Sequence, residues 1–390
     1  MNLYIFNPET DLALAYGGTS YTPGSRIRGM VHDLAALPLW FAPPGSALLL
    51  PDDEAVPFVR AMSEQWGLNV HPVTVAALRP AEITAVFPWG WNRTLRHRLL
   101  RMGLAEELLP SEEELRFRRE CSSRALVAEV LSLFGNDADC GGVSVNLATE
   151  EACEAFVRTC PEGVVFKSPW SGSGKGLCWC RGKYEEKHRS WCRKVLREQG
   201  LVTAQPVWRR THDFAMEFFS DGTEWRFVGY SLFSANAQGA YEGNLLLSDA
   251  GIEEVLGTSV PVEALHRARR TLLDFLQPYA CKYHGYMGVD MMTGREAGSS
   301  RELLHPCVEM NWRMNMGVLS HRLARLLVAD GVRASFQLKN YADAAALQQE
   351  FGRLCAQHPL CVENGRVTAG ILPLTPVTAT AASVAFISAG

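Results

Sequence analysis

Short apolar runs separated by proline and glycine mark the first third of the chain. These runs occupy residues 3–6, 47–50 and 85–87, with a helical pattern at 56–66. Strands that alternate with helices predict a small α/β unit with a parallel sheet over residues 1–115. The polar loops 7–11 and 88–92 directly follow two of these strands. Ligands of open α/β sheets bind beyond the carboxyl ends of strands, so both loops are candidate ligand loops; turns held by Asn and Asp side chains are the alternative.

The middle of the chain predicts helices followed by antiparallel strands. A helix start at Ser111 precedes a predicted helix at 150–160, a strand at 163–167 and β-rich stretches at 201–208, 213–219 and 225–233. The dipeptide Asp221-Gly222 between the last two stretches is typical of a hairpin turn. Apolar residues at helical spacing between Pro261 and Pro278 predict a helix over 261–276. A further helix is predicted near 342–358, and the pattern assigns no element to the Ala- and Thr-rich end.

Two later strands carry isolated polar groups. Asp290 interrupts the apolar run 286–292, and a turn at 293–301 leads into the stretch 307–315, in which polar and apolar residues alternate. This alternation predicts a strand with the side chains of Glu309, Asn311, Arg313 and Asn315 on one face. A carboxylate and a carboxamide supply oxygen ligands for Mg²⁺, and a guanidinium binds phosphate or carboxylate oxygens. An amphipathic edge strand with a solvated face is the alternative.

Composition excludes several classes of protein. With 390 residues, 47% hydrophobic and 21% charged, the chain resembles an ordinary globular protein of two or three structural units. The net charge of −4 and the absence of a long basic run predict no nucleic-acid or membrane partner. No apolar run is long enough to span a bilayer, and the first residues lack the basic region of a signal peptide. We therefore expect a cytoplasmic protein.

Eleven cysteines without a Cys-x-x-Cys pair favour free thiols over a disulfide framework. Cys178, Cys180, His188 and Cys192 could be written as a zinc site. Their Cys-x-Cys start differs from the usual gap between zinc ligands, so ordinary thiols are the better interpretation.

A serine- and glycine-rich loop follows the predicted strand that ends at Lys167. Residues 171–176 contain three glycines and two serines, so their backbone can approach phosphate oxygens closely. The loop is not a P-loop, because Gly176 follows Lys175 where Ser or Thr would stand. It does not match a dinucleotide fingerprint either, because a predicted strand follows it. A flexible hairpin turn is the alternative interpretation.

Taken together, these features resemble the ATP-grasp superfamily over roughly residues 115–320. Glu309-Met310-Asn311-Trp312-Arg313 is the most specific piece, because it looks like the Glu-x-Asn-x-Arg strand of the carboxylase and amide-ligase branches. The resemblance implies an α/β and α+β protein in which an α/β pre-ATP-grasp-like domain precedes a two-lobed ATP-grasp fold with antiparallel sheets. The implied domains are 1–115, 116–325 with lobes at 116–205 and 206–325, and a C-terminal helix and tail at 326–390.

The resemblance also implies roles for individual residues. Lys167 would contact the α-phosphate and the adenine edge, and Ser171, Gly172, Ser173, Gly174 and Lys175 would cover the β- and γ-phosphates. Asp290, Glu309 and Asn311 would hold two Mg²⁺ ions. Arg313, catalytic together with Lys167, would face the transferred phosphoryl group or the tetrahedral intermediate. Gln205 and Val207 would lie on the strand that reads adenine, and Asp213 would bind the ribose.

Two departures from the family pattern are visible. Gln205 stands where an acidic residue is usual. Where the family has its first phosphate-binding lysine, this chain has only arginines: Arg118, Arg119 and Arg124. Arginine also binds phosphate, and of the three we take Arg119 as the candidate.

The resemblance implies an ATP- and Mg²⁺-dependent carboxylate-amine ligase that works through an acyl phosphate. Its expected partners are a small carboxylate and an amine, and a homodimer with a second copy of the chain is the candidate assembly. A small-molecule kinase and a non-catalytic nucleotide-binding protein are the alternatives. The polar segment 233–244 and the loop 89–92 are candidates for the acceptor pocket, with ordinary surface loops as the alternative.

Overall fold

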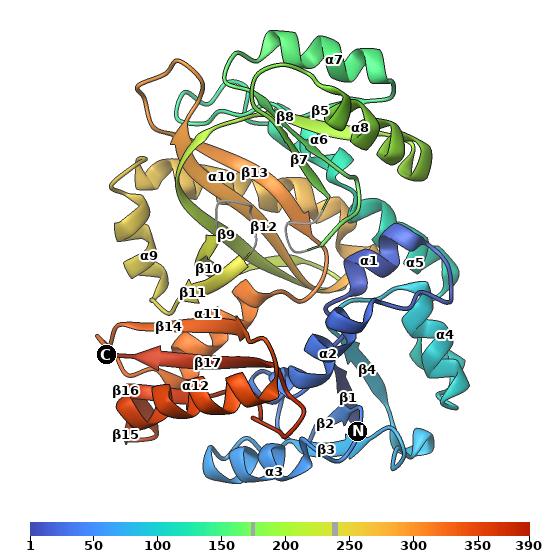
Figure 1. Ribbon diagram of the computed structural model, residues 1–390, viewed down its shortest axis with the longest axis vertical. Coiled ribbons are helices and arrows are strands. Elements are labelled where there is room, and N and C mark those ends of the chain that lie inside the picture. The colour runs from blue at the N-terminus through green and yellow to red at the C-terminus, as the bar shows by residue number, and fades with distance from the viewer. Residues whose placement is uncertain (173–175, 236–240) are drawn as a thin grey trace. The chain divides into compact units, whose positions relative to one another are not determined.

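The computed structural model describes residues 1–172, 176–235 and 241–390 (Figure 1). These residues form two compact units. The first unit contains residues 1–115, 242–248 and 314–390, and the second contains residues 116–241 and 249–313. The predicted C-terminal helix and tail therefore group with the N-terminal residues. Within the described residues, no helix has both the length and the apolar character needed to span a bilayer.

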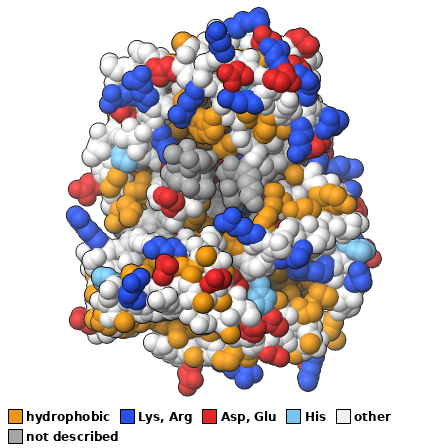
Figure 2. Space-filling view, in the orientation of Figure 1, with side chains coloured by type: hydrophobic (Ala, Val, Ile, Leu, Met, Phe, Trp, Pro, Cys, Tyr) orange, Lys and Arg blue, Asp and Glu red, His pale blue; other side chains and the backbone are white. Residues whose placement is uncertain are grey.

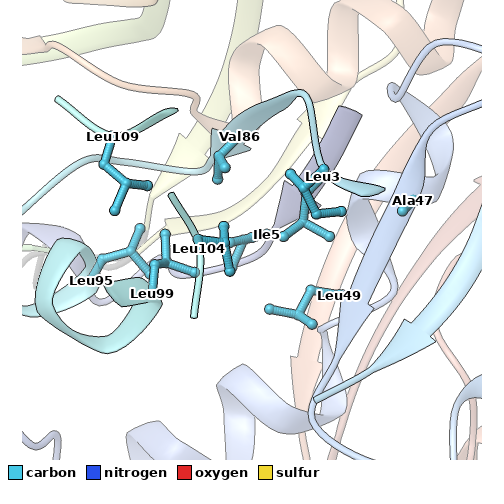
Figure 3. Packing of buried hydrophobic residues seen from close by; sticks show 10 residues of the cluster. Leu3, Ile5, Ala47, Leu49, Val86, Leu95, Leu99, Leu104 and Leu109 are labelled. Carbon is cyan, nitrogen blue, oxygen red and sulfur yellow. The ribbon is translucent and has the colours of Figure 1, made fainter. Parts of the chain in front are cut away.

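The first unit begins with a parallel sheet of strand order β3-β2-β1-β4. The elements of residues 1–115 are β1 (Asn2–Ile5), α1 (Thr10–Tyr16), α2 (Ser25–Asp33), η1 (Leu37–Trp40), β2 (Ala47–Leu50), α3 (Val56–Gln65), β3 (His71–Thr74), η2 (Pro80–Glu82), β4 (Ala85–Pro88), α4 (Arg93–Arg101) and η3 (Glu106–Leu108). Every residue of β2 is buried, as expected for a strand covered on both faces. Leu3, Ile5 and Leu49 pack with Leu95 and Leu99 of α4 in one apolar cluster (Figure 3).

The C-terminal residues of the first unit add an antiparallel sheet of order β11-β14-β17-β16-β15. Its elements are β11 (Tyr241–Leu245), α11 (Met316–Leu327), β14 (Ala334–Asn340), α12 (Ala344–Gln357), β15 (Cys361–Glu363), β16 (Arg366–Pro373) and β17 (Ser383–Ala389). Leu347 and Phe351 of α12 pack on Ile371, Val384 and Phe386 of this sheet. The unassigned end of the sequence thus forms a strand that pairs with a neighbour on each side, β14 and β16.

The second unit contains two antiparallel sheets. Its elements are α5 (Glu112–Cys121), η4 (Arg124–Leu126), α6 (Val127–Ser132), β5 (Val145–Leu147), α7 (Glu150–Thr159), β6 (Val164–Lys167), β7 (Leu177–Cys180), α8 (Glu186–Gln199), β8 (Val202–Pro206), β9 (Arg209–Asp221), β10 (Trp225–Ala235), α9 (Asp249–Leu256), α10 (Val262–Leu276), η5 (Gln277–Lys282), β12 (His284–Arg295) and β13 (Leu303–Asn311). The first sheet has the order β5-β8-β6-β7, and the second contains β13-β12-β9-β10 in that order. The predicted helix 261–276 and the hairpin at Asp221-Gly222 are confirmed.

Period-two alternation gives each sheet of the second unit one apolar and one polar face. In the first sheet, Val164, Phe166 and Ala204 pack with side chains of α7 and α8. Side chains of neighbouring residues point to opposite faces, so Lys167 and Gln205 lie on the face away from these helices. On the surface, Arg189 and Arg193 of α8 form ion pairs with Glu154 and Glu150 of α7 at 3.1 and 2.6 Å. Figure 2 shows basic and acidic side chains interspersed at the top of the view, where these helices lie.

The predicted strand 307–315 ends earlier than expected. Strand β13 stops at Asn311, and the Arg313 N–H donates to the Asn311 carbonyl at 2.8 Å. The side chain of Asn315 then accepts a hydrogen bond from the Val318 N–H at 2.9 Å and caps α11. Asparagine is a favoured N-cap, so the helix start overrides the alternation. The prediction that Arg313 and Asn315 lie on the strand is therefore wrong.

Candidate nucleotide site

Lys167, at the end of β6, connects the two sheets of the second unit. Its ammonium group donates to Gln205 Oε1 at 2.5 Å and to the Val308 carbonyl of β13 at 3.3 Å. The register pairs Val165 with Gln205, which places Lys167 and Gln205 on the same face of the first sheet. Burial and the nearby charge of Arg124 lower the pKa of Lys167 to about 8. This face therefore presents a buried cation toward β13.

The loop after Lys167 is described at both of its ends. The Ser168 N–H donates to the Gly176 carbonyl at 2.8 Å and closes the loop, and the Ser171 side chain is buried. Gly176 has a φ of +74°, and a Cβ there would lie 2.6 Å from Ser171 Oγ, so only glycine fits. Gly172 is partly buried. The predicted phosphate contacts Ser173, Gly174 and Lys175 lie outside the described residues.

Strands β12 and β13 bring the predicted metal ligands together. Asp290 is directly opposite Glu309, and Asn311 is opposite Gly288, so the three polar side chains share one face of the second sheet. Burial, followed by the charges of Glu309 and Glu217, raises the pKa of Asp290 to about 8, and a hydrogen bond from Asn311 opposes this rise. The site therefore concentrates negative charge where water screens it poorly.

Glu217 of β9, which was not among the predicted site residues, extends this acidic face. The register places Glu217 opposite Gly288, and its carboxylate accepts a hydrogen bond from Ser231 Oγ at 3.0 Å. The sequence does contain a signal: Glu217 interrupts the apolar stretch Phe214 to Phe219 in the same way as Asp290 interrupts its own strand. Glu217 was not predicted because it does not belong to the Glu-x-Asn-x-Arg motif.

Arg124 completes the site and is the arginine beside Glu309. Its guanidinium group donates to both Glu309 carboxylate oxygens, at 2.8 and 2.9 Å, and to the Ser168 carbonyl at 2.8 Å. It also donates to Ser171 Oγ. Only 4% of the Arg124 side chain is exposed, against 27% for Glu309. Arg124 therefore joins the serine-glycine loop to the acidic face.

Arg119, the arginine predicted to bind phosphate, has a different environment. Its guanidinium lies over the Trp170 ring, 3.9 Å from the ring centroid. The Trp170 indole N–H donates to the Arg119 carbonyl at 2.8 Å, which fixes the two residues together. The described contacts thus place Arg124 against Glu309 and Ser171.

The remaining predicted site residues have the following contacts. Arg313 Nη2 donates to Asn311 Oδ1 at 2.9 Å, so its guanidinium lies beside a predicted metal ligand. The Val207 N–H donates to the Gly163 carbonyl at 3.0 Å and continues the pairing of the first sheet. Asp213 forms an ion pair with Arg210 at 2.6 Å, and burial raises the pKa of Asp213 to about 6. The β9–β12 register places Asp213 on the face that carries Asp290.

The donor set fits Mg²⁺ bound together with phosphate. No three His, Cys, Asp or Glu side chains among the described residues form a ready-made metal site. Mg²⁺ usually takes only one or two carboxylates from the protein and the rest of its ligands from phosphate and water. Asp290 and Glu309 are two such carboxylates. Burial and then the charges of Glu309 and Glu217 raise the pKa of Asp290, and a bound cation would favour its ionised form.

Comparison with known proteins identifies the fold. No protein-family model matches the sequence, and a search of curated proteins finds no match. A biotin carboxylase from Campylobacter jejuni in a beta-gamma-ATP complex superposes with a TM-score of 0.53 and 12% identity, over 100% of this chain and 87% of that one. N5-carboxyaminoimidazole synthetase from Staphylococcus aureus gives 0.51 and 9%, over 99% and 93%. The corresponding ribonucleotide synthetase from Thermus thermophilus gives 0.50 and 14%, over 100% and 93%. The chain has the ATP-grasp fold, and the predicted fold class is confirmed.

Proposed function

We propose that this protein is an ATP- and Mg²⁺-dependent ligase that activates a carboxylate as an acyl phosphate for attack by an amine. One observation carries the proposal: buried Arg124 contacts the Glu309 carboxylate, which lies opposite Asp290, and buried Lys167 contacts the backbone of the same strand, β13. Lys167 donates to the backbone of β13, and Arg124 donates to Glu309. Opposed cations and carboxylates are the groups that a metal-bound polyphosphate requires. The fold shared with a biotin carboxylase in a beta-gamma-ATP complex supports this assignment.

The basic residues would bind the phosphates. Lys167 would contact the α-phosphate, and the loop from Ser171 to Lys175 would cover the β- and γ-phosphates with its backbone N–H groups. We assign the role of the missing first lysine to Arg124, because its guanidinium reaches both Ser171 and Glu309. A guanidinium binds two phosphate oxygens at once, which suits this position. Nucleotide affinities of Arg124→Met and Arg119→Met decide between the two arginines; a larger loss for Arg119→Met would restore the earlier candidate.

The acidic residues would hold the metal. Asp290 and Glu309 would bind Mg²⁺, with Asn311 completing a second position. When bound, Mg²⁺ neutralises the phosphate charge and acts as a Lewis acid. Arg313, hydrogen-bonded to Asn311, would face the transferred phosphoryl group. These groups act by position and charge, which are the main contributions of a protein to phosphoryl transfer.

The end of β8 would bind the base. The Lys167 ammonium can only donate, so it fixes the Gln205 carboxamide with its oxygen toward the lysine. The NH₂ group is then left to donate to a ring nitrogen of adenine. Val207 and Asp213 would complete the nucleotide contacts, Asp213 through a ribose hydroxyl.

The reaction would take place in two steps. The substrate carboxylate attacks the γ-phosphorus and ADP leaves; an amine then attacks the acyl carbon and phosphate leaves. Exclusion of water by the serine-glycine loop would protect the acyl phosphate from hydrolysis. All eleven cysteines are free thiols, which suits a reducing compartment, and we place the activity in the cytoplasm. Association with a second copy of the chain stays a prediction.

The test is phosphate release by the purified protein with ATP, Mg²⁺ and pools of amino acids and small carboxylates. We expect release to depend on one carboxylate and one amine, and Asp290→Asn to abolish it. Asp274→Asn in the exposed part of α10 is the matched control and should keep full activity. Near-normal turnover by Asp290→Asn would count against the assignment. A stable phosphorylated product formed without an amine would identify a kinase instead.

A further inference from the structure

The parallel sheet of the first unit has a topological switch point between β1 and β4. The chain proceeds from β1 to β2 and β3 on one side and then places β4 on the other side of β1 (Figure 1). Both neighbours pair with β1 in parallel, so the carboxyl ends of β1 and β4 lie at the same edge. In open α/β sheets, ligands bind outside the strands' carboxyl ends at such a point.

The two loops at this edge hold each other in a fixed arrangement. Asn7 Nδ2 donates to the Gly90 carbonyl at 2.7 Å, and the Gly90 N–H donates back to Asn7 Oδ1 at 3.3 Å. Asn92 Nδ2 donates to Thr10 Oγ1 at 3.0 Å. A Cβ at Gly90 would lie 2.5 Å from Thr10 Cγ2, so the loops approach too closely for any other residue. The side chains of Asn7 and Asn92 thus form hydrogen bonds that position the loops. One neighbouring polar side chain has an oxygen without such a bond.

That neighbour is Glu9. Its Oε2 atom is buried and has no hydrogen-bond partner in the described part of the chain. Glu9 precedes α1, but its side chain makes no capping hydrogen bond to that helix. Burial raises the pKa of Glu9, and its own backbone N–H and the charge of Arg98 oppose this rise. A buried acceptor without a donor costs about 1–3 kcal/mol, and more when it is charged. The charge of Arg98 stabilises this carboxylate from a distance, but Oε2 has no donor among the described residues.

We propose that Glu9 Oε2 anchors the ammonium group of a small-molecule substrate at the carboxyl ends of β1 and β4. An ammonium group has the charge and the donors that this oxygen lacks, and such charge-assisted bonds are about twice as strong as neutral ones. The identification of this ligand as the amine that attacks the acyl phosphate rests on the proposed function, whereas the binding site itself does not.

The site is tested with the full-length protein, without nucleotide, by calorimetric titration. The probes are single amino acids and simple alkylamines, each compared with its N-acetyl derivative, which lacks the ammonium group. We expect at least one amine to bind and its N-acetyl derivative to bind at least tenfold more weakly. Glu9→Gln should lose the same factor for the amine, and Glu107→Gln, an exposed glutamate of η3, should bind as the unchanged protein does.

Several results would overturn the proposal. These are failure of every amine to bind, equal binding of an amine and its N-acetyl derivative, and equal amine affinity of Glu9→Gln. The first two comparisons use the unchanged protein, so they hold even if the variant folds poorly. ATP titrations of the same samples separate this proposal from the proposed function. If Glu9→Gln loses amine binding but still binds ATP, the Glu9 site is supported. If the unchanged protein binds an amine but no ATP, only the ligase assignment is contradicted.

Discussion

The ion pair between Arg124 and Glu309 should be a strong interaction of the ligand-free protein. We expect it to be measurable by a double-mutant cycle of Arg124→Met, Glu309→Gln and the combined variant. The pair has two hydrogen bonds of 2.8 and 2.9 Å, and Arg124 is almost fully buried. The shapes of the replacements are similar to those of the original side chains, so the cycle isolates the charge interaction.

The magnitude follows from the geometry. Breaking a buried ion pair from one side costs about 3–5 kcal/mol, because the other charge stays unpaired. Glu309 is 27% exposed, so water relieves part of this cost, and we expect Arg124→Met to lose about 3 kcal/mol of unfolding free energy. Glu309→Gln should lose about 1–2 kcal/mol, because Arg124 keeps its bonds to Ser168 and Ser171. The coupling energy should be about 2 kcal/mol, as for charge-assisted hydrogen bonds.

The assay is urea denaturation without nucleotide or metal, followed by tryptophan fluorescence. Arg116→Met is the control, because Arg116 is exposed, and it should change the unfolding free energy by less than about 0.5 kcal/mol. A coupling energy near zero would refute the reasoning: Arg124 would then act through Ser168 and Ser171 alone, and Glu309 would be an independent carboxylate.

Three further predictions concern single residues. Burial and the charge of Lys167 lower the pKa of His305 to about 3, so the unfolded chain binds a proton at this residue before the folded protein does. The unfolding free energy is therefore unaffected by His305 above about pH 6.5 and is lower by about 2 kcal/mol at pH 5. His305→Leu should show a smaller difference between the unfolding free energies in urea at pH 7 and pH 5. Asp290→Asn should raise the melting temperature at pH 7, because a carboxyl group whose pKa rises to about 8 on folding must take up a proton at a cost of about 4 kcal/mol, and an unchanged or lower value would contradict the raised pKa of Asp290. Gly90→Ala should cost about 1–3 kcal/mol in urea unfolding through contact with Thr10, and a neutral effect would mean that the two loops are not fixed together.

Elements with a clear hydrophobic period were predictable from the sequence. The helix over 261–276 was found because its apolar residues recur at helical spacing between two prolines, and the hairpin at Asp221-Gly222 because its turn residues are distinctive. Strand β17 was missed because its sequence, Ser383 to Ala389, is small and apolar without alternation, and six of its seven residues are buried. A fully buried strand does not show period two.

The site was predictable only where its residues are close in a strand or hairpin. Glu309 and Asn311 are two residues apart on β13, and one hairpin brings Asp290 opposite Glu309. The contact of Arg124 with Glu309 joins positions 185 residues apart. No local period encodes such a pairing, so three neighbouring arginines could not be told apart by sequence. The contacts of Arg124 with Glu309 and Ser168 are the observations from which we propose Arg124.

The electrostatics of the ligand-free site indicate what it is built to bind. Burial lowers the pKa of Lys167 and raises that of Asp290, so both groups are held where their charged forms are unfavourable. Arg124 compensates the charge of Glu309. It therefore occupies a carboxylate that a metal would need. A metal-bound triphosphate would supply an anion to Lys167 and Arg124 and a cation to Asp290 and Glu309 at the same time. A metal ion alone would pair with the carboxylates and leave the basic side chains buried without an anion, and a nucleotide alone would do the reverse. The two ligands should therefore bind together.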